Sequence, residues 1–226
     1  MVLESLNLEK NDSVIYVVHV KEVFLWEIED LYSRGAARSA NVSPPTAQKW
    51  IVEVEQELPD VNDTYEKSIN EEDPELQRDY IIDEMWHFLN NKEDKLLCIK
   101  IFYATKNKLV GYELGGRDED TVLKLYNRIR GTKNITFYSD DWSTFQKVFT
   151  DNNERYFIGK EYTHSLERHN SNTRHYLGRF HRRTKIVSRS TQMVDISIKL
   201  QTFRYEHKHL MAKYLEPLFP RVGAVA

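Results

Sequence analysis

Cysteine is almost absent from this chain of 226 residues, with Cys98 as its single representative. One cysteine cannot close an internal disulfide, and it cannot build the cysteine-rich cluster of a structural zinc site. Cys98 lies within the apolar run 96–103. We therefore expect it to fill core space in a reducing compartment, and we predict a cytoplasmic protein.

Long hydrophobic runs are missing as well. No uninterrupted apolar stretch approaches the roughly 18 residues that a membrane span needs. The first residues, Met1 to Glu4, lack the basic-then-apolar order of a signal peptide. With 40% apolar and 30% charged residues, the composition predicts one large soluble domain, or a core plus a small module.

Several common catalytic patterns are absent. The eight histidines have no cysteine partners and no compact metal-ligand spacing, which disfavours a zinc site. Gly115 and Gly116 form a turn signal without the surroundings of a phosphate-binding loop. Ser139 and Ser165 lack the neighbours of an activated nucleophile, which disfavours a serine hydrolase.

Charge, by contrast, is abundant and unevenly distributed. Residues 53–94 hold fifteen acids against three bases, whereas residues 160–213 hold twelve Lys and Arg against four acids. A basic half is typical of a surface that meets a phosphate backbone. An ordinary solvated charged face is the alternative interpretation, and a metal site nearby would favour the nucleic-acid one.

Three acids stand in distinctive local settings. Asp83 follows the apolar run 80–82, Asp140 follows the apolar-rich segment 135–139, and Glu167 begins a polar segment patterned like a helix. Two carboxylates at strand ends and a third on a later helix can hold two Mg²⁺ ions for phosphoryl transfer. Taken singly, each acid could equally be a turn former, a helix cap or an exposed side chain.

Two neighbouring acids compete for the same roles. Glu84 follows Asp83, and Asp141 follows Asp140. Because side chains alternate across a strand, we expect only one residue of each pair to face the site.

The first 58 residues predict a small helical segment. Apolar residues recur at helical spacing over 21–31, and a second helix is expected over 47–58, with Ser43 as its N-cap and Pro44 in the first turn. Two helices around a short polar turn resemble a helix-turn-helix, although any helical hairpin would look similar. Residues 59–79, with two prolines and eight acids, predict an acidic linker.

The remaining pattern predicts an α/β catalytic domain over 80–213 and a tail over 214–226. We expect strands over 80–89, 96–104, 108–114, 135–139 and 156–159, and helices over 118–130, 142–149 and 162–180. Three meandering strands followed by alternating helices and strands give the order of a ribonuclease-H-like core, a mixed five-stranded sheet flanked by helices.

The segment 160–170, Lys-Glu-Tyr-Thr-His-Ser-Leu-Glu-Arg-His-Asn, resembles the C-terminal signature of transposases of the insertion-sequence-one family. Three upstream segments resemble motifs of that family in the same order, at 83–86, 115–117 and 139–142. The resemblance extends over about 80–190 and is most specific near Glu167.

This resemblance implies a DDE-type transposase that cleaves element ends and transfers strands into target DNA. It implies Asp83, Asp140 and Glu167 as catalytic and metal-binding acids for two Mg²⁺ ions, with Mn²⁺ as a substitute. The residues implied to hold DNA phosphates are Arg168, Asn170, Arg174, Arg182 and Arg183, while His169 and Asn172 would position the helix. The implied partners are inverted-repeat ends, target DNA and a second subunit in a homodimer or larger assembly on DNA.

The chain departs from the family pattern in three places. It has no cysteine-rich zinc ribbon, its helix-turn-helix is shortened around Gly35, and Asp141 replaces the usual glycine. These departures keep open a DNA-binding or regulatory derivative without productive transposition. A nuclease or resolvase of the same fold is a third alternative.

Overall fold

The computed structural model describes residues 37–38, 41–70, 76–129, 134–152, 154–159, 163–181 and 188–215. The predicted helix over 21–31, the turn at Gly35, Arg182 and Arg183 therefore lie outside the described residues. The chain divides into two compact units, Met1–Leu58 with Lys208–Ala226, and Pro59–His207. Each unit is described separately below.

The first unit contains helix α3 (Pro44–Glu57) and helix α9 (Lys208–Leu215), which contact each other. The Ser43 hydroxyl accepts a hydrogen bond from the Thr46 backbone N–H at 3.3 Å, which satisfies one free donor of the first helical turn. The predicted helix and its cap are thus confirmed. Whether this segment reads DNA as a helix-turn-helix stays a prediction.

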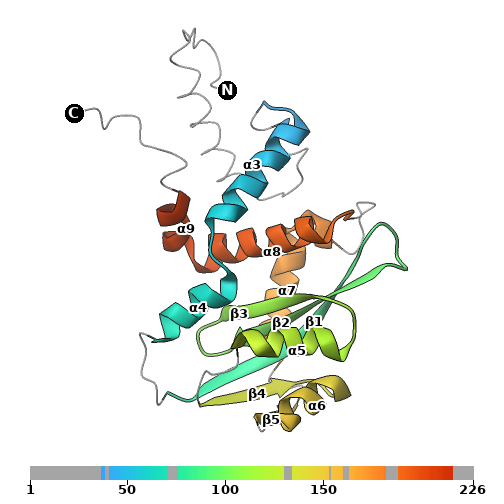
Figure 1. Cartoon of the computed structure of the whole chain (residues 1–226), viewed down its shortest axis with the longest axis vertical. Helices are drawn as coiled ribbons and strands as arrows, with labels where there is room; N and C mark the ends of the chain where they lie inside the picture. Colours follow the sequence, from blue (N-terminus) through green and yellow to red (C-terminus); the bar gives the residue numbers. More distant parts are fainter. Residues whose placement is uncertain are drawn as a thin grey trace, which may run out of the picture. The chain divides into compact units, whose positions relative to one another are not determined.

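The second unit is built on a five-stranded mixed sheet (Figure 1). Its strands are β1 (Arg78–Phe88), β2 (Lys95–Tyr103), β3 (Lys108–Gly115), β4 (Ile135–Ser139) and β5 (Arg155–Ile158). They lie in the order β3-β2-β1-β4-β5, with antiparallel β3-β2-β1 pairing and parallel β1-β4-β5 pairing. This is the predicted ribonuclease-H-like arrangement, and each predicted strand lies within two residues of an observed one.

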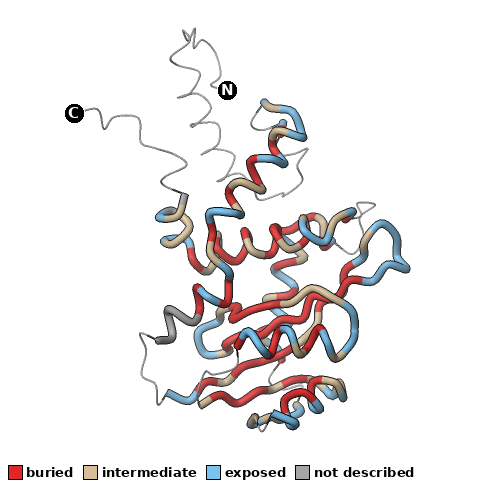
Figure 2. The backbone as a smooth tube through the Cα atoms, in the orientation of Figure 1, coloured by how far each residue is buried: buried red, intermediate tan, exposed pale blue. Residues whose placement is uncertain are grey.

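Helices cover both faces of the sheet. Helices α5 (Glu119–Ile129) and α6 (Ser143–Asp151) cover one face, and their apolar residues join those of the strands in one core cluster. Helix α7 (His164–Tyr176) packs against β1, and helix α8 (Thr191–Glu206) packs against β3. The central strands are accordingly buried along most of their length (Figure 2).

Three helices, α4, α8 and the α9 described above, were not predicted from the sequence. Helix α4 (Val61–Asn70) occupies part of the expected acidic linker and packs against β3, with Tyr65 buried beside Tyr80. Its apolar residues Val61, Tyr65 and Ile69 recur at helical spacing, but they are few among polar residues. Helix α8 has buried residues around most of its circumference, including Val194, Ile196 and Ile198, so it lacks the single apolar stripe that identifies a surface helix.

Candidate active site

The site lies where β1 extends beyond the end of its neighbour β4. β1 pairs with β4 only as far as Ile82, whose partner Ser139 is the last residue of β4. Beyond that point β1 continues to Phe88, paired on its other side with β2. Asp83 and Glu84 therefore lie beside an edge that β4 leaves open, and Asp140 follows directly after β4.

Three carboxylates gather at this edge, and we call them the acidic site: Asp83, Glu84 and Asp140. One carboxylate oxygen from each lies within 4.8 Å of the others. The expectation that Asp83 and Glu84 would exclude each other is wrong. Neighbouring side chains of β1 point to opposite faces of the sheet. Because β4 ends at Ser139, Asp140 lies beyond the strand, and its carboxylate lies close to those of both Asp83 and Glu84. Asp141 is exposed and is not part of this group.

Burial and neighbouring charges raise the pKa values of Asp83 and Glu84. Burial, followed by the charges of Asp140 and Glu167, raises the pKa of Asp83 from 3.8 to about 6, against opposing hydrogen bonds. Burial and the charges of Asp140 and Asp83 raise the pKa of Glu84 from 4.5 to about 7, although the Arg117 guanidinium opposes that shift. Near neutral pH the acidic site therefore favours an added positive charge.

The oxygens of the acidic site fit a divalent metal ion. Asp140 Oδ1 and Glu84 Oε2 are shielded from solvent, and no hydrogen-bond partner for either lies within the described part of the chain. Buried polar atoms without partners are unusual and cost free energy. Carboxylate oxygens are also the ligands that Mg²⁺ and Mn²⁺ prefer. Asp83, Glu84 and Asp140 are thus the residues that could hold such an ion.

Glu167 approaches the acidic site from helix α7 without joining it. Its carboxylate accepts a hydrogen bond from the Thr163 hydroxyl at 3.1 Å and lies 3.7 Å from His164 Nδ1. The side chain is 61% exposed. Its charge contributes to the raised pKa of Asp83, so it acts on the site electrostatically from the α7 side.

Asn170 connects α7 to the acidic site directly. Its amide nitrogen donates a hydrogen bond to Asp83 Oδ2 at 3.0 Å, and the residue is only 3% exposed. The resemblance implied a phosphate contact for Asn170. That contact stays a prediction, while in the structure the hydrogen bond of Asn170 lowers the pKa of Asp83 against the larger effect of burial.

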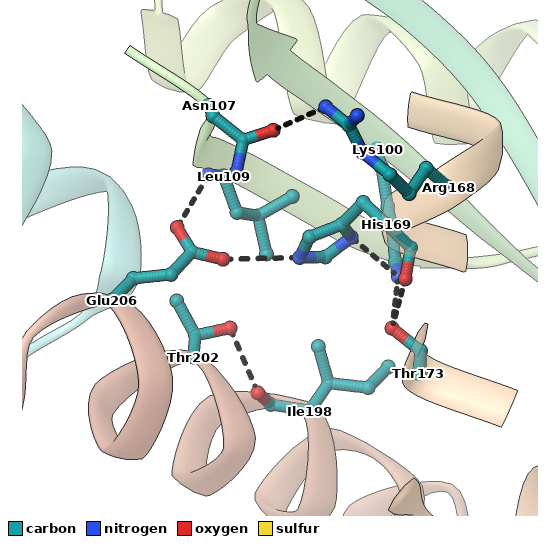
Figure 3. A network of polar contacts seen from close by, with 9 residues as sticks. All are labelled: Lys100, Asn107, Leu109, Arg168, His169, Thr173, Ile198, Thr202 and Glu206. Atoms are coloured by element: carbon teal, nitrogen blue, oxygen red, sulfur yellow. Dashed lines mark hydrogen bonds and ion pairs between the residues drawn. The ribbon is translucent and has the colours of Figure 1, made fainter. Parts of the chain in front are cut away.

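A second polar cluster lies deeper on the α7 face of the sheet (Figure 3). We call it the Lys100 network: Lys100, His169, Thr173 and Glu206. Lys100 Nζ donates to Thr173 Oγ1 at 3.0 Å and lies 3.4 Å from His169 Nδ1. His169 Nε2 lies 3.0 Å from Glu206 Oε1, and Glu206 Oε2 accepts from the Leu109 backbone N–H at 2.6 Å.

This network joins four elements, since its hydrogen bonds connect β2, β3, α7 and α8. Lys100 is fully buried, and burial lowers its pKa. Burial and the charge of Lys100 also lower the pKa of His169, against the opposing effect of Glu206. A neutral His169 with its proton on Nε2 can donate to Glu206 and accept from Lys100 at once. The network therefore holds α7, and with it Asn170 and Glu167, against the sheet.

Comparison with known families identifies the family of this chain. The family model described as IS1 transposase matches residues 80–210, which include all of the acidic site and the Lys100 network. That match covers more than half of the chain. The chain belongs to the IS1 transposase family.

Relatives within the IS1 family match about half of the chain. The insertion element IS1 protein InsB of Shigella flexneri is 24% identical over 114 residues, which is 50% of this chain and 86% of the relative. An IS1 protein InsB of Escherichia coli K12 is 24% identical over 114 residues and 67% of its own length.

Solved structures of another transposase also match. The Mos1 strand transfer complex gives a TM-score of 0.43 at 11% identity, covering 88% of this chain and 74% of the other. The Mos1 transposase paired-end complex with the left transposon end gives 0.40 at 11% identity, covering 90% and 76%.

The basic residues that the IS1 resemblance implied for DNA contact have different surroundings. Arg168 is exposed on α7 and donates to Asn107 Oδ1 at 3.2 Å. Arg174 is half-buried, and its charge adds to the lowered pKa of Lys100. Asn172 is exposed.

Within the described ranges, no helix is both long and apolar enough to cross a membrane.

Proposed function

We propose that this member of the IS1 transposase family is an active DNA transposase. It would catalyse metal-dependent strand cleavage at element ends and strand transfer into target DNA. The observation that carries the proposal is the acidic site, because its three carboxylates lie within 4.8 Å of one another and the pKa values of Asp83 and Glu84 are raised by burial and by neighbouring charges. A protein that only binds DNA gains nothing from such a cluster.

Asp83, Asp140 and Glu167 are proposed as the catalytic acids, and Glu84 is added to them because its carboxylate lies in the acidic site. Bound Mg²⁺ or Mn²⁺, two ions in the proposed form, would supply stabilisation of the attacking and leaving oxygens of an in-line displacement at phosphorus. Asn170 orients Asp83 through its hydrogen bond. Thr163 holds Glu167 in the same manner.

The proposed partners are element ends, target DNA and a second subunit, since cleavage of paired ends suits a homodimer or larger assembly on DNA. The exposed guanidinium of Arg168 lies one residue from Glu167 and would contact DNA phosphates, as would Arg174. Residues 1–58 are proposed to recognise DNA, and residues 80–213 to carry the chemistry.

A strand-transfer assay tests this function. The purified chain is incubated with DNA carrying the inverted repeats that flank its gene, with Mg²⁺, Mn²⁺ or EDTA, and nicked and joined products are resolved. We expect metal-dependent nicking and joining that Asp140→Asn abolishes. DNA binding without metal-dependent nicking would establish the regulatory derivative instead, and cleavage without joining would establish a nuclease.

A further inference from the structure

Arg117 lies in a tight turn between β3 and α5. A Cβ added to Gly116 would lie 2.1 Å from Asp118 Oδ2, and one added to Gly115 would lie 2.4 Å from Thr121 Oγ1. Both distances are too short for a side chain, so the two glycines allow the turn to close onto the start of α5. Asp118 caps that start by accepting from the Thr121 backbone N–H at 2.9 Å. Arg117 therefore projects from a well-defined backbone.

The guanidinium of Arg117 is held by groups from separate elements. Its central carbon lies 4.8 Å from the ring centroid of Trp142 and 6.0 Å from that of Trp86. Its Nη2 lies 3.2 Å from Glu84 Oε1. Indole rings attract a cation placed over their faces at such distances. The position of the head group is thus set in advance, which lowers the entropy cost of using it to bind a ligand.

This guanidinium contacts the acidic site through Glu84. Its partner Glu84 shares the site with Asp83 and Asp140, yet the Arg117 side chain is 48% exposed. A guanidinium carries five N–H donors in a planar fork that matches the oxygens of a phosphate. The hydrogen bond to Glu84 occupies one of its terminal nitrogens, which leaves donors for a second oxyanion.

We propose that Arg117 is a phosphate-binding residue of this site, and that its guanidinium contacts the phosphodiester on which the acids act. The inference rests on the proposed function. Trp86 and Trp142 act as positioning residues that hold the guanidinium over the site. The DNA strand therefore meets a fixed positive charge at an edge otherwise lined by carboxylates.

A simpler role for Arg117 would be to neutralise Glu84, and the two roles predict different results. If Arg117 only neutralises Glu84, removing the arginine weakens DNA binding by exposing an unpaired negative charge. That loss would vanish once Glu84 is neutral. If Arg117 binds phosphate, the loss persists when Glu84 is replaced by glutamine.

The experiment measures affinity for a labelled random-sequence DNA duplex by fluorescence anisotropy in EDTA, so that no metal contributes. Four proteins are compared first: the unaltered chain, R117Q, R117K and R155Q. Arg155 is the matched control, because it is an exposed arginine at the start of β5, the end of the sheet opposite Asp140. We expect R117Q to bind about tenfold more weakly, R117K to fall between, and R155Q to match the unaltered chain.

Salt dependence and a double variant complete the test. Loss of one phosphate contact should lower the slope of log affinity against log salt by about 0.9. The loss of DNA affinity caused by R117Q should also appear when E84Q/R117Q is compared with E84Q. Thermal unfolding of each variant checks that the fold is retained, and R117K keeps the charge if R117Q proves unstable.

Two results would overturn the inference: equal affinity of R117Q and the unaltered chain, or a loss that disappears in the E84Q background. Neither depends on catalysis. If the unaltered chain binds DNA through Arg117 but never nicks it with Mg²⁺ or Mn²⁺, the proposed function fails while the phosphate contact stands. If nicking occurs and R117Q binds normally, the phosphate contact alone fails.

Discussion

The acidic site and the Lys100 network begin at one cross-strand pair. Asp83 on β1 lies opposite Lys100 on β2 in the antiparallel register, so both side chains leave the same face of the sheet toward α7. The side chain of Asp83 reaches the open edge beside β4, whereas that of Lys100 is fully buried. The acidic site keeps shielded oxygens without partners, while each member of the network has hydrogen bonds.

This contrast distinguishes residues suited to binding a ligand from residues that stabilise the fold. A buried polar network that is fully hydrogen-bonded fixes one arrangement of the elements that it joins. A crowded set of carboxylates is unfavourable in isolation and becomes favourable when a cation binds. We infer that the network stabilises the position of α7, and that the acidic site sacrifices some stability for function.

Asp83→Asn should remove activity without removing the fold. Metal-assisted catalysis contributes several kcal/mol, so we expect strand cleavage to slow on the order of a thousandfold or more. The thermal midpoint at pH 7.5 without divalent cations should stay the same or rise, because the variant lacks a charge that Asp140 and Glu167 oppose. A large fall in midpoint would show that Asp83 is structural, contrary to the contrast drawn above.

Glu206→Met, in contrast to Asp83→Asn, should destabilise the fold. The substitution leaves two donors, the Leu109 N–H and His169 Nε2, without their acceptor. Each unsatisfied buried donor costs about 1–3 kcal/mol, so the free energy of unfolding should fall by about 3 kcal/mol. Urea unfolding measures this fall in the free energy of unfolding.

Thr202→Val provides the matched control, since the Thr202 hydroxyl donates to the Ile198 carbonyl of its own helix and thus joins no second element in the described part of the chain. Its cost should stay near 1 kcal/mol. Equal costs for the two substitutions would remove the special role of the Lys100 network.

Asn170→Ala tests the bridge between the two regions. Removing a group that orients a metal ligand typically costs 10–100-fold in metal affinity, and we expect about tenfold here, because Asn170 makes one hydrogen bond to Asp83. Calorimetric titration with Mn²⁺ measures the change. Asn172→Ala, on the exposed side of α7, should leave the affinity unaltered.

The pH dependence of stability is the smallest of the expected effects. The folded pKa values of Asp83 and Glu84 lie above their ordinary values, so the folded state binds more protons than the unfolded state between about pH 4 and 7. These acids therefore make the protein less stable as pH rises through that window. The buried His87 and His169, whose pKa values are lowered, contribute the opposite slope.

A difference measurement isolates the acids. Urea unfolding of the unaltered chain and of the double variant D83N/E84Q is compared at pH 5 and pH 7.5 without divalent cations. The double variant should gain stability relative to the unaltered chain at the higher pH. A gain at the lower pH instead would contradict the raised pKa values.

Much of the second unit could be predicted because its local patterns are strong. β4 was predicted with both ends correct, since its apolar run stops at a polar pair. Asp140 was placed directly after its strand by the same pattern, whereas the expectation of a strand end at Asp83 is wrong, because β1 continues to Phe88. Glu167 was assigned to the correct helix, although its exposed position beside the acidic site follows from tertiary packing.

What could not be predicted depends on contacts between distant segments. Glu84 joins the acidic site only because β4 ends early, and the length of a neighbouring strand does not enter the alternation rule. Asn170 looked like a surface residue of a polar helix until its partner Asp83, 87 positions away, was placed beside it. Lys100 gave no signal beyond an interruption of an apolar strand, because its partners lie on α7.

The hairpin between β1 and β2 has a consequence for how this family can change. Asn90, with φ of 56°, and Asn91, whose side chain accepts from the backbone of Glu93 and Asp94, set the turn. Insertion or deletion of one residue there would shift the strand register and turn alternate side chains to the opposite face. The proposed metal ligands and the buried lysine would then be misplaced together, so the length of this loop is under the same constraint as the acids of the site.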